Sequence, residues 1–330
     1  MKRNYYITKC GELKRKDNSL IVILEDNEKH TIPIETVDTL YIIGEVTLNS
    51  KLIDFISSKG ITMHFFNYYG YYSGSYYPRE TLNSGFLLVN QVEHYSNNKK
   101  RLFIAKEILK AGTYNIHRNL RYYNTRGKDL QEEIDRIAEL REKLDLQGTV
   151  EQLMGIEGNI RETYYRAFNK IINQEINFEK RVKRPPDNMI NSLISFINSL
   201  MYTTITSEIY HTQLVPTISY LHQPGTKRFS LSLDISEIFK PLIVDRLIFS
   251  LLNKNQITED DFESKLNYLY LKDKGKRVVL EEYENKIQTT LMHKKLGRNV
   301  SYKHLIRLEL YRLVKHLTGE EEYEGFKIWW

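Results

Sequence analysis

The chain contains one cysteine, Cys10, among its 330 residues. A single cysteine excludes an internal disulfide, and with it a small disulfide-stapled scaffold, and it favours a reducing compartment. It also excludes a zinc site built from several thiolates. The N-terminus lacks the apolar segment of a signal peptide, and no run of about 18 apolar residues could span a membrane. We therefore expect a soluble, cytoplasmic protein.

Signatures of several enzyme classes are missing as well. The sequence has no Gly-x-Ser-x-Gly motif, no phosphate-binding loop and no glycine-rich dinucleotide motif. These absences argue against hydrolases with a nucleophile triad and against enzymes with a nucleotide cofactor. Apolar material is ample, because hydrophobic residues make up 41% of the chain and charged residues 27%. A chain of this length and composition has room for two folded domains.

The N-terminal part has the pattern of β structure. Residues 19–26 form a short β-branched run, and residues 30–48 alternate apolar and polar side chains with a period of two. A short helix is expected after them, capped by Asn49 or Ser50. Residues 70–77 predict a hairpin with Ser73-Gly74 at its tip. We interpret residues 1–77 as a small β-sandwich that carries one short helix.

Helical spacing replaces this pattern from about residue 91. Amphipathic runs are expected at residues 97–118, 128–144, 147–175, 188–213, 234–253 and 301–317. The predicted fold class is therefore α+β. The expected order is the β-rich domain over 1–77, a linker over 78–95 and a larger all-α domain over 96–330.

Positive charge is concentrated in three stretches of the helical part. The chain has 48 Lys and Arg against 42 Asp and Glu, which gives a net charge of +6. Residues 97–126 and 286–316 each hold eight basic residues and one acid, and residues 159–184 hold seven against three. Tyrosines such as Tyr122 and Tyr302 lie among them. Cations for phosphates beside rings for base stacking are typical of nucleic-acid surfaces. Solvated helix faces are the alternative for any one stretch, whereas the three together favour nucleic acid.

A carboxylate interrupts the apolar stripe of the helix expected over 147–175. Steps of three and four residues place on one face Val150, Leu153, Glu157, Ile160, Tyr164, Phe168 and Ile171. An unpaired carboxylate on a buried face costs several kcal/mol, so Glu157 requires a cation or another tight partner. Gly155 and Gly158 each weaken the helix by about 1 kcal/mol relative to alanine, which suggests the close approach of a ligand. An ion pair with a basic neighbour is the structural alternative.

A second polar group lies within residues 220–241. His222 precedes a Pro-Gly turn, and Asp234 is expected to open a helix, with Glu237 three residues later. Asp234 and Glu237 also fit a capping box, which is the structural alternative for both acids. Together with Glu157 they form a set of carboxylates and one imidazole that suits Mn²⁺ or Mg²⁺. The histidine favours Mn²⁺, because Mg²⁺ prefers oxygen ligands.

A divalent cation held by acids in a basic protein indicates phosphodiester chemistry. The cation would neutralise a nonbridging oxygen, activate the attacking hydroxyl or water and stabilise the leaving oxygen. The alternative from another class is a non-catalytic DNA-binding scaffold, in which Glu157 merely pairs with an arginine. Dependence on a metal separates the two. A role at a membrane surface is disfavoured, since the basic stretches form no Trp- and Leu-faced amphipathic helix.

The chain resembles, along nearly its whole length, the CRISPR-associated spacer-acquisition integrase and endonuclease family (Cas-one), the larger of the two universal adaptation proteins. The resemblance rests on four regions in a fixed order. The first combines GELKRKDNSLIVILED and IPIETVDTLYIIG, and the others are MGIEGNIRETYYRAF, RPPDNMINSLISFINSL and YLHQPGTKRFSLSLDISEIFKP. It implies a β-sandwich, a linker and a helical domain with a metal site that faces a basic surface.

The resemblance also implies roles for single residues. The family's glutamate ligand falls on Glu157, its histidine ligand on His222 and its later acidic ligand on Glu237. Asp234 matches the other acid of that motif and is either a ligand, a partner of a ligand or a helix cap. Ile160-Arg161 departs from the small residues usual after the family's glutamate. Our candidates for contact with the DNA backbone are Lys180, Arg181, Lys183, Arg184, Arg118, Arg121, Lys294 and Lys295.

The implied reaction is a transesterification that depends on Mg²⁺ or Mn²⁺. The 3′-hydroxyl of a short duplex fragment attacks a phosphodiester at the edge of a CRISPR repeat and inserts a new spacer, and the same site cleaves DNA. The resemblance also implies a homodimer formed through the β domains and a complex with a small adaptation subunit. A general structure-selective nuclease that never integrates would share the same residues. Joining of a 3′-hydroxyl strand to repeat DNA separates these two possibilities.

Overall fold

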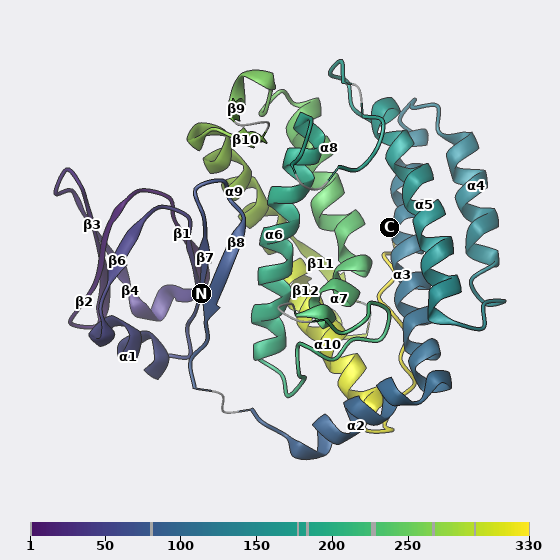
Figure 1. Ribbon diagram of the computed structural model, residues 1–330, viewed down its shortest axis with the longest axis horizontal. Helices are drawn as coiled ribbons and strands as arrows, with labels where there is room; N and C mark the ends of the chain where they lie inside the picture. Colours follow the sequence, from purple (N-terminus) through teal and green to yellow (C-terminus); the bar gives the residue numbers. More distant parts are fainter. Residues whose placement is uncertain are drawn as a thin grey trace. The chain divides into compact units, whose positions relative to one another are not determined.

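Figure 1 shows the computed structural model, which describes residues 2–79, 82–176, 178–182, 185–225, 229–265, 268–293 and 295–329. The chain divides into two compact units, Met1–Thr81 with Leu271–Leu280, and Leu82–Tyr270 with Glu281–Trp330. The first is rich in strands and the second in helices, so the predicted α+β fold class is confirmed. Among the described residues, no helix has the length and apolar character needed to cross a lipid bilayer.

Two four-stranded sheets form the first unit. Their strands are β1 (Arg3–Ile7), β2 (Gly11–Lys16), β3 (Ser19–Leu24), β4 (Lys29–Pro33), β5 (Val37–Ile42), β6 (Val46–Leu48), β7 (Thr62–Phe66) and β8 (Tyr72–Tyr76). One sheet has the order β4-β3-β2-β6 and the other the order β1-β5-β7-β8. Burial alternates along β3, where Leu20, Val22 and Leu24 are buried, as the period of two predicts. Both sheets contribute to one core, which confirms the predicted β-sandwich.

One α-helix accompanies these sheets, together with the short 3₁₀ turn η1 (Ile34–Thr36). The helix, α1 (Ser50–Ser58), begins where the Asn49 side chain accepts a hydrogen bond from the Leu52 amide. Of the two caps expected, Asn49 is therefore the one used. The helix buries Leu52, Phe55 and Ile56, and the chain turns away at Gly60, whose φ is +67°.

The hairpin that ends the sandwich differs from the prediction. The turn between β7 and β8 lies at Asn67–Gly70, where the Gly70 amide donates to the Asn67 carbonyl. Gly70 has a φ of +82° and so supplies the left-handed residue that this turn uses. Gly74 lies within β8, opposite Phe65, so the predicted tip at Ser73-Gly74 is wrong.

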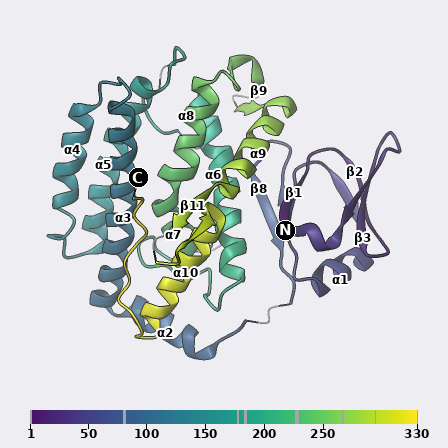
Figure 2. The same ribbon diagram turned by 180° about the vertical axis from the view of Figure 1, so that it is seen from behind.

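Helices make up most of the second unit. They are α2 (Gly85–Ser96), α3 (Asn98–Asn124), α4 (Gln131–Glu142), α5 (Val150–Ile171), α6 (Met189–Tyr210), α7 (Ser230–Lys240), α8 (Arg246–Asn253) and α10 (Tyr302–Leu317). A π-helical turn, η2 (Pro241–Asp245), joins α7 to α8, and the 3₁₀ turn η3 (Glu259–Asp261) follows α8. The long helix α3 packs against α4, α5 and α7, whereas α6 packs against α7 and α10. Both Figure 1 and Figure 2 show α3, α4 and α5 side by side.

The predicted all-α character of residues 96–330 is wrong in two places. One hairpin joins β11 (Thr290–His293) to β12 (Arg298–Ser301), and another pairs β9 (Phe262–Lys265) with β10 (Tyr268–Leu271). Strands of four residues are too short to display a period of two. The helix α9 (Asp273–Gln288) follows the second hairpin and was also not predicted. Residues Leu271–Leu280 belong to the compact unit of the sandwich, although the sequence pattern groups them with the helices.

The stretch 78–95, predicted as a linker, is mostly helical because α2 occupies it from Gly85 onward. Large apolar side chains of α2 are exposed, with Phe86 at 68% and Val89 at 66%. The residues that α2 buries include the polar Gln91 and His94. The usual amphipathic pattern is therefore inverted in this helix, which explains why periodicity alone did not predict it.

Candidate metal-binding active site

The helix α5 presents the predicted apolar stripe with Glu157 in its middle. Thr149 and Gln152 start the helix with a capping box. The stripe is confirmed, since its other members are buried and are Val150, Leu153, Ile160, Tyr164, Phe168 and Ile171. The Glu157 side chain is 19% exposed. Gly155 and Gly158 are exposed, and a Cβ added to either would meet no atom within 4 Å, so close packing does not explain these glycines.

Arg161 joins Glu157 to a second helix. Its Nε donates to Glu157 Oε1 at 3.2 Å, one turn earlier on α5. Its other guanidinium nitrogen, Nη2, donates to Glu237 Oε2 on α7. The ion pair stated as the alternative for Glu157 is therefore present in the structure. The two acids nonetheless come from different helices and converge on one cation.

Glu237 is buried and is held by two cations. Lys240 Nζ donates to Glu237 Oε1 at 2.8 Å, while Arg161 takes the other oxygen. Burial acts to raise the pKa of Glu237, but Lys240 and Arg161 outweigh it and lower that pKa to about 2. Glu237 is thus ionised at neutral pH. The backbone of α7 at Glu237 packs closely against Gly112 of α3. A Cβ at position 112 would lie 2.6 Å from the Glu237 carbonyl oxygen, so this approach requires glycine.

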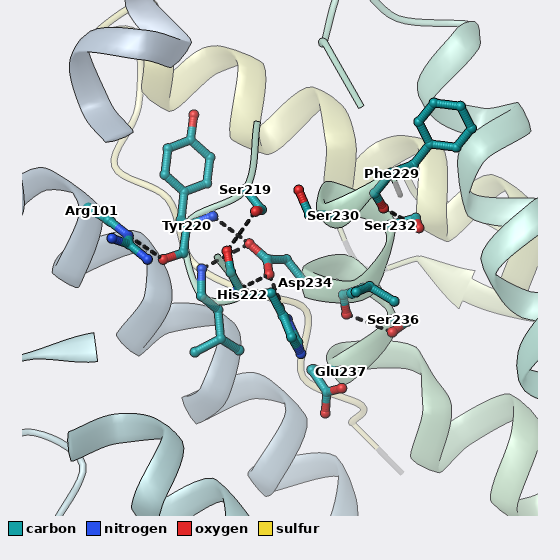
Figure 3. A network of polar contacts seen from close by, with 12 residues as sticks. Arg101, Ser219, Tyr220, His222, Phe229, Ser230, Ser232, Asp234, Ser236 and Glu237 are labelled. Carbon is teal, nitrogen blue, oxygen red and sulfur yellow. Dashed lines mark hydrogen bonds and ion pairs between the residues drawn. The ribbon is translucent and has the colours of Figure 1, made fainter. Parts of the chain in front are cut away.

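Asp234 has a different environment, although it lies on the same helix. Its buried carboxylate accepts hydrogen bonds from the backbone amides of Tyr220 at 2.6 Å, Leu221 at 3.0 Å and His222 at 2.9 Å. Figure 3 shows this loop gathered around the carboxylate. Because α7 begins at Ser230, the expectation that Asp234 opens the helix is wrong, and the capping box with Glu237, stated as the structural alternative, is absent. The acid satisfies the buried amides of another segment instead.

His222 lies between the two acids of α7. Its Nδ1 is 2.9 Å from Asp234 Oδ1, a hydrogen bond in which the imidazole Nδ1–H donates and the carboxyl oxygen accepts. The imidazole extends from Asp234 toward Glu237 (Figure 3), with Nε2 at its far end. The loop is held by two further contacts: Ser219 Oγ donates to the His222 carbonyl, and Arg101 Nε donates to that of Tyr220. Histidines that bind metals are commonly oriented by a carboxylate in this way.

The residue types at this site fit a divalent cation, whereas their present arrangement is not a closed metal cluster. Glu157, Glu237 and His222 supply two carboxylates and an imidazole, a donor set suited to Mn²⁺ and tolerable for Mg²⁺. In the part of the chain that the structure describes, no three His, Cys, Asp or Glu side chains are grouped to hold a metal. The guanidinium of Arg161 contacts both glutamates, so a metal bound by both would require it to move.

Three charged residues of the site were not among the predicted ones. Arg161 and Lys240 lie four and three residues after the acids they contact, a spacing that brings helical side chains together and is visible in the sequence. The third, Asp245, lies in η2 and is buried. Burial raises the pKa of Asp245 to about 7 although Arg161 and Lys240 lower it. Its Oδ2 has no hydrogen-bond partner among the described residues.

The candidates for contact with DNA on α3 lie in a strongly positive region. Arg121 is exposed and Arg118 half-buried. Burial, together with the charges of Arg141, Arg121 and Arg118, lowers the pKa of the neighbouring His117 to about 4. Such crowding of positive charge favours an anionic partner.

The remaining candidates fall into three groups. Lys180 and Lys295 are exposed and accessible to a ligand. Arg181 is engaged within the protein, because its guanidinium donates to Asn191 Oδ1 at 2.9 Å and to Ser195 Oγ at 2.8 Å. It thereby ties the segment after α5 to α6. Three candidates lie outside the described residues, namely Lys183, Arg184 and Lys294.

A basic cavity that was not predicted lies at the end of α3. Arg126 and Arg246 lie over the ring of Tyr122, at 4.4 Å and 4.5 Å from its centroid. Lys286 lines the same cavity, whose volume is about 530 Å³. Burial and the charge of Arg246 lower the pKa of Lys286 to about 8. Aromatic rings that stack on bases, beside cations that bind phosphates, are typical of sites for single-stranded nucleic acid.

Comparison with known sequences identifies relatives of the whole chain. The family model described as CRISPR associated protein Cas1 matches residues 5–285. A CRISPR-associated endonuclease Cas1 of Fusobacterium nucleatum is 58% identical over 330 residues, covering 100% of this chain and 98% of the relative. One from Thermodesulfovibrio yellowstonii is 48% identical, covering 99% and 100%. The matched range includes all three candidate metal ligands.

Solved structures agree with these relatives. A Cas1 protein from Thermotoga maritima has a TM-score of 0.88 at 42% identity and covers 99% of this chain and 100% of its own. A casposase bound to integration product has a TM-score of 0.87 at 21% identity, covering 98% and 92%, a likeness of fold alone. The fold, the family model and the extent of the match to sequence relatives lead to one assignment. The chain belongs to the CRISPR-associated Cas1 family.

Proposed function

We propose that this chain is a metal-dependent DNA endonuclease and integrase of CRISPR adaptation. It joins the 3′-hydroxyl of a short DNA duplex to a phosphodiester at the edge of a CRISPR repeat. The observation that carries the proposal is that Glu157 of α5 and Glu237 of α7 converge on one cationic position beside an oriented histidine. The names of the curated relatives, which are endonucleases, support the nuclease chemistry. A casposase of the same fold, bound to integration product, supports strand joining.

Each side chain of the site has a role in this proposal. Glu157, His222 and Glu237 hold Mg²⁺ or Mn²⁺, which when bound neutralises charge on the phosphodiester and activates the attacking oxygen. Asp234 keeps the proton of His222 on Nδ1 and leaves Nε2 free to bind the metal. Lys240 stays on Oε1 of Glu237 and offsets part of its charge.

The basic surfaces would hold the DNA backbone. Arg118 and Arg121 of α3, with Lys180 and Lys295, offer cations for phosphates, and the cavity around Tyr122 adds a ring contacted by two guanidiniums. Contacts of this kind weaken steeply with salt, because each neutralised phosphate releases condensed counterions. Binding of DNA should therefore be strong at low ionic strength and weak at high.

Two partners belong to the proposal. We propose a homodimer formed through the β-sandwich, and a complex with a small adaptation subunit. Structures titled as Cas6-RT-Cas1–Cas2 complexes share the fold, one with a TM-score of 0.85 at 19% identity, and they support such a partner. Light scattering of the purified chain, alone and with the subunit, measures both assemblies.

A strand-transfer assay tests the proposed reaction. Supercoiled plasmid with a CRISPR repeat and a duplex with a free 3′-hydroxyl are incubated with Mn²⁺, with Mg²⁺ or with a chelator, in the presence of the small subunit. We expect joining that requires metal and disappears in Glu157→Ala and in His222→Ala. Glu162→Ala is the matched control, because Glu162 lies on the same helix in an exposed ion pair with Arg166.

The alternatives give different results in the same assay. Metal-dependent nicking without joining would indicate a general nuclease. Binding of DNA without chemistry under every condition would indicate a scaffold, for which the Glu157–Arg161 ion pair is the structural argument. Joining that survives either active-site substitution would contradict our assignment of the metal ligands.

A further inference from the structure

Arg161 is the cation at the centre of the candidate site. Its side chain is 14% exposed, and its guanidinium contacts Glu157 at 19% and Glu237 at 7% exposure. Two carboxylates that share one guanidinium in a partly dry environment would repel each other without the charge of that cation. Arg161 therefore supplies the charge that lets the two acids face each other when no metal is bound.

The position of this guanidinium is the one that the metal needs. Arg161 contacts Glu157 Oε1 on its own helix and Glu237 Oε2 on α7, so one guanidinium bridges the two acids. Lys240 uses the other oxygen of Glu237 and need not leave when a metal binds. The guanidinium of Arg161 and a metal ion cannot both contact the same two carboxylate oxygens. Binding of the metal therefore requires the guanidinium to leave them.

We infer that Arg161 occupies the metal position in the metal-free protein and is displaced when the metal enters. This inference rests on the proposed function. The displaced side chain remains on α5, three residues after Gly158, where the helix surface is open. The planar donors of a guanidinium match the oxygens of a phosphate, so the DNA backbone offers Arg161 a new partner. Metal and DNA then favour the same state of the site and strengthen each other's binding.

This exchange predicts opposite effects on two steps. Arg161→Gln removes the competitor, so Mn²⁺ should bind about tenfold more tightly, because apparent affinity falls with the fraction of protein in which the position is taken. The same change removes the donors for the phosphate, so strand transfer at saturating Mn²⁺ should fall. Arg161→Lys, which keeps the charge but not the planar fork, should lie between. A merely structural arginine would affect stability and leave Mn²⁺ affinity unchanged.

Calorimetric titration of the full chain with Mn²⁺ alone measures the first effect without any reaction. The rise in unfolding temperature on adding Mn²⁺ is a second readout, and it should be larger in Arg161→Gln than in wild type. Arg166→Gln is the matched control. Arg166 forms an ion pair with Glu162, four residues earlier on α5, just as Arg161 does with Glu157. The side chains of Arg166 and Glu162 are, however, 67% and 63% exposed. Arg166→Gln should bind Mn²⁺ as wild type does.

The outcomes distinguish this inference from the proposed function. Tighter Mn²⁺ binding with weaker strand transfer in Arg161→Gln supports the exchange. Equal Mn²⁺ affinity in wild type and Arg161→Gln, with binding lost in Glu157→Gln, overturns the exchange and leaves the proposed function standing. Absence of Mn²⁺ binding from wild type and all variants overturns both. If Arg161→Gln does not fold, Arg161→Lys carries the same comparison.

Discussion

Two regions around α7 treat a buried carboxylate in opposite ways. In the first half of the helix, Asp234 accepts hydrogen bonds from three backbone amides of the 220–222 segment and contacts His222 Nδ1. One turn later, Glu237 is held by the side chains of Arg161 and Lys240. Backbone donors cannot leave without unfolding the loop, whereas long side chains can rotate away. The first acid therefore belongs to the architecture, and the second is able to exchange its partner.

The difference shows that the type of hydrogen-bond donor, and not the acid itself, determines whether a buried carboxylate can exchange its partner. The two acids are three residues apart and both are buried. A metal competes poorly with amides already fixed in place, but it competes well with a flexible cation. Each of the following changes tests one side of this contrast.

The largest effect is expected for Asp234→Ala. The change leaves three buried amides without their acceptor and releases His222, so the free energy of unfolding should fall by about 3–5 kcal/mol. Denaturation in urea measures it. Ser236→Ala is the control, because Ser236 Oγ donates within its own helix to the Leu233 carbonyl, and the loss should stay near 1 kcal/mol. Equal losses in the two variants would remove the contrast.

Glu157→Gln should have the opposite profile to Asp234→Ala, with a large loss of activity and a small loss of stability. The rate of metal-dependent DNA cleavage should fall roughly 100-fold or more, since a bound metal contributes several kcal/mol to the transition state. The free energy of unfolding should change by about 1 kcal/mol or less, because a glutamine can still accept from Arg161. Cleavage rates and urea denaturation of the same preparation check both statements. A large loss of stability would place Glu157 with Asp234 as an architectural acid.

Asp245 is a third buried acid and predicts a pH dependence. Its pKa rises to about 7 on folding from an ordinary 3.8, mainly through burial, so the folded state keeps a proton that the unfolded state has lost. Stability should therefore fall as pH rises from about 4 to about 7, by about 3 kcal/mol, because each unit of pKa shift is worth about 1.4 kcal/mol, and Asp245→Asn should remove that fall. Denaturation curves across this range measure it. An unchanged pH profile in the variant would show that Asp245 is already ionised in the folded protein.

The smallest effect is expected among the basic residues. Arg121→Ala should weaken DNA binding several-fold and reduce the slope of log K against log salt by about one, with stability unchanged. Arg181→Ala should instead lower stability, because Arg181 holds Asn191 and Ser195. Fluorescence anisotropy at several salt concentrations, together with thermal unfolding, compares the two. Identical behaviour would mean that engagement within the protein does not separate these cations.

Local pattern was sufficient for a good part of the fold. The alternation along β3, the Asn49 cap of α1 and the stripe of α5 all depend on residues close in sequence, and the structure confirms them. The same logic failed where the pattern was short or inverted. The four-residue strands of the two hairpins show no period, and α2 exposes Phe86 while it buries polar residues.

For the site, the sequence by itself determined which residue types are available and that Glu157 needs a partner on its apolar face. Only the tertiary structure determined which residues contact the acids of the site. Arg161 and Glu237 are 76 positions apart, and the loop that uses Asp234 comes from 12 to 14 positions earlier in the chain. Such contacts depend on how α5, α7 and the loop pack, which no local period records. Burial makes these contacts necessary, because a carboxylate removed from water is stable only beside a hydrogen-bond donor or a cation. The packing of the helices determines which donor or cation that is.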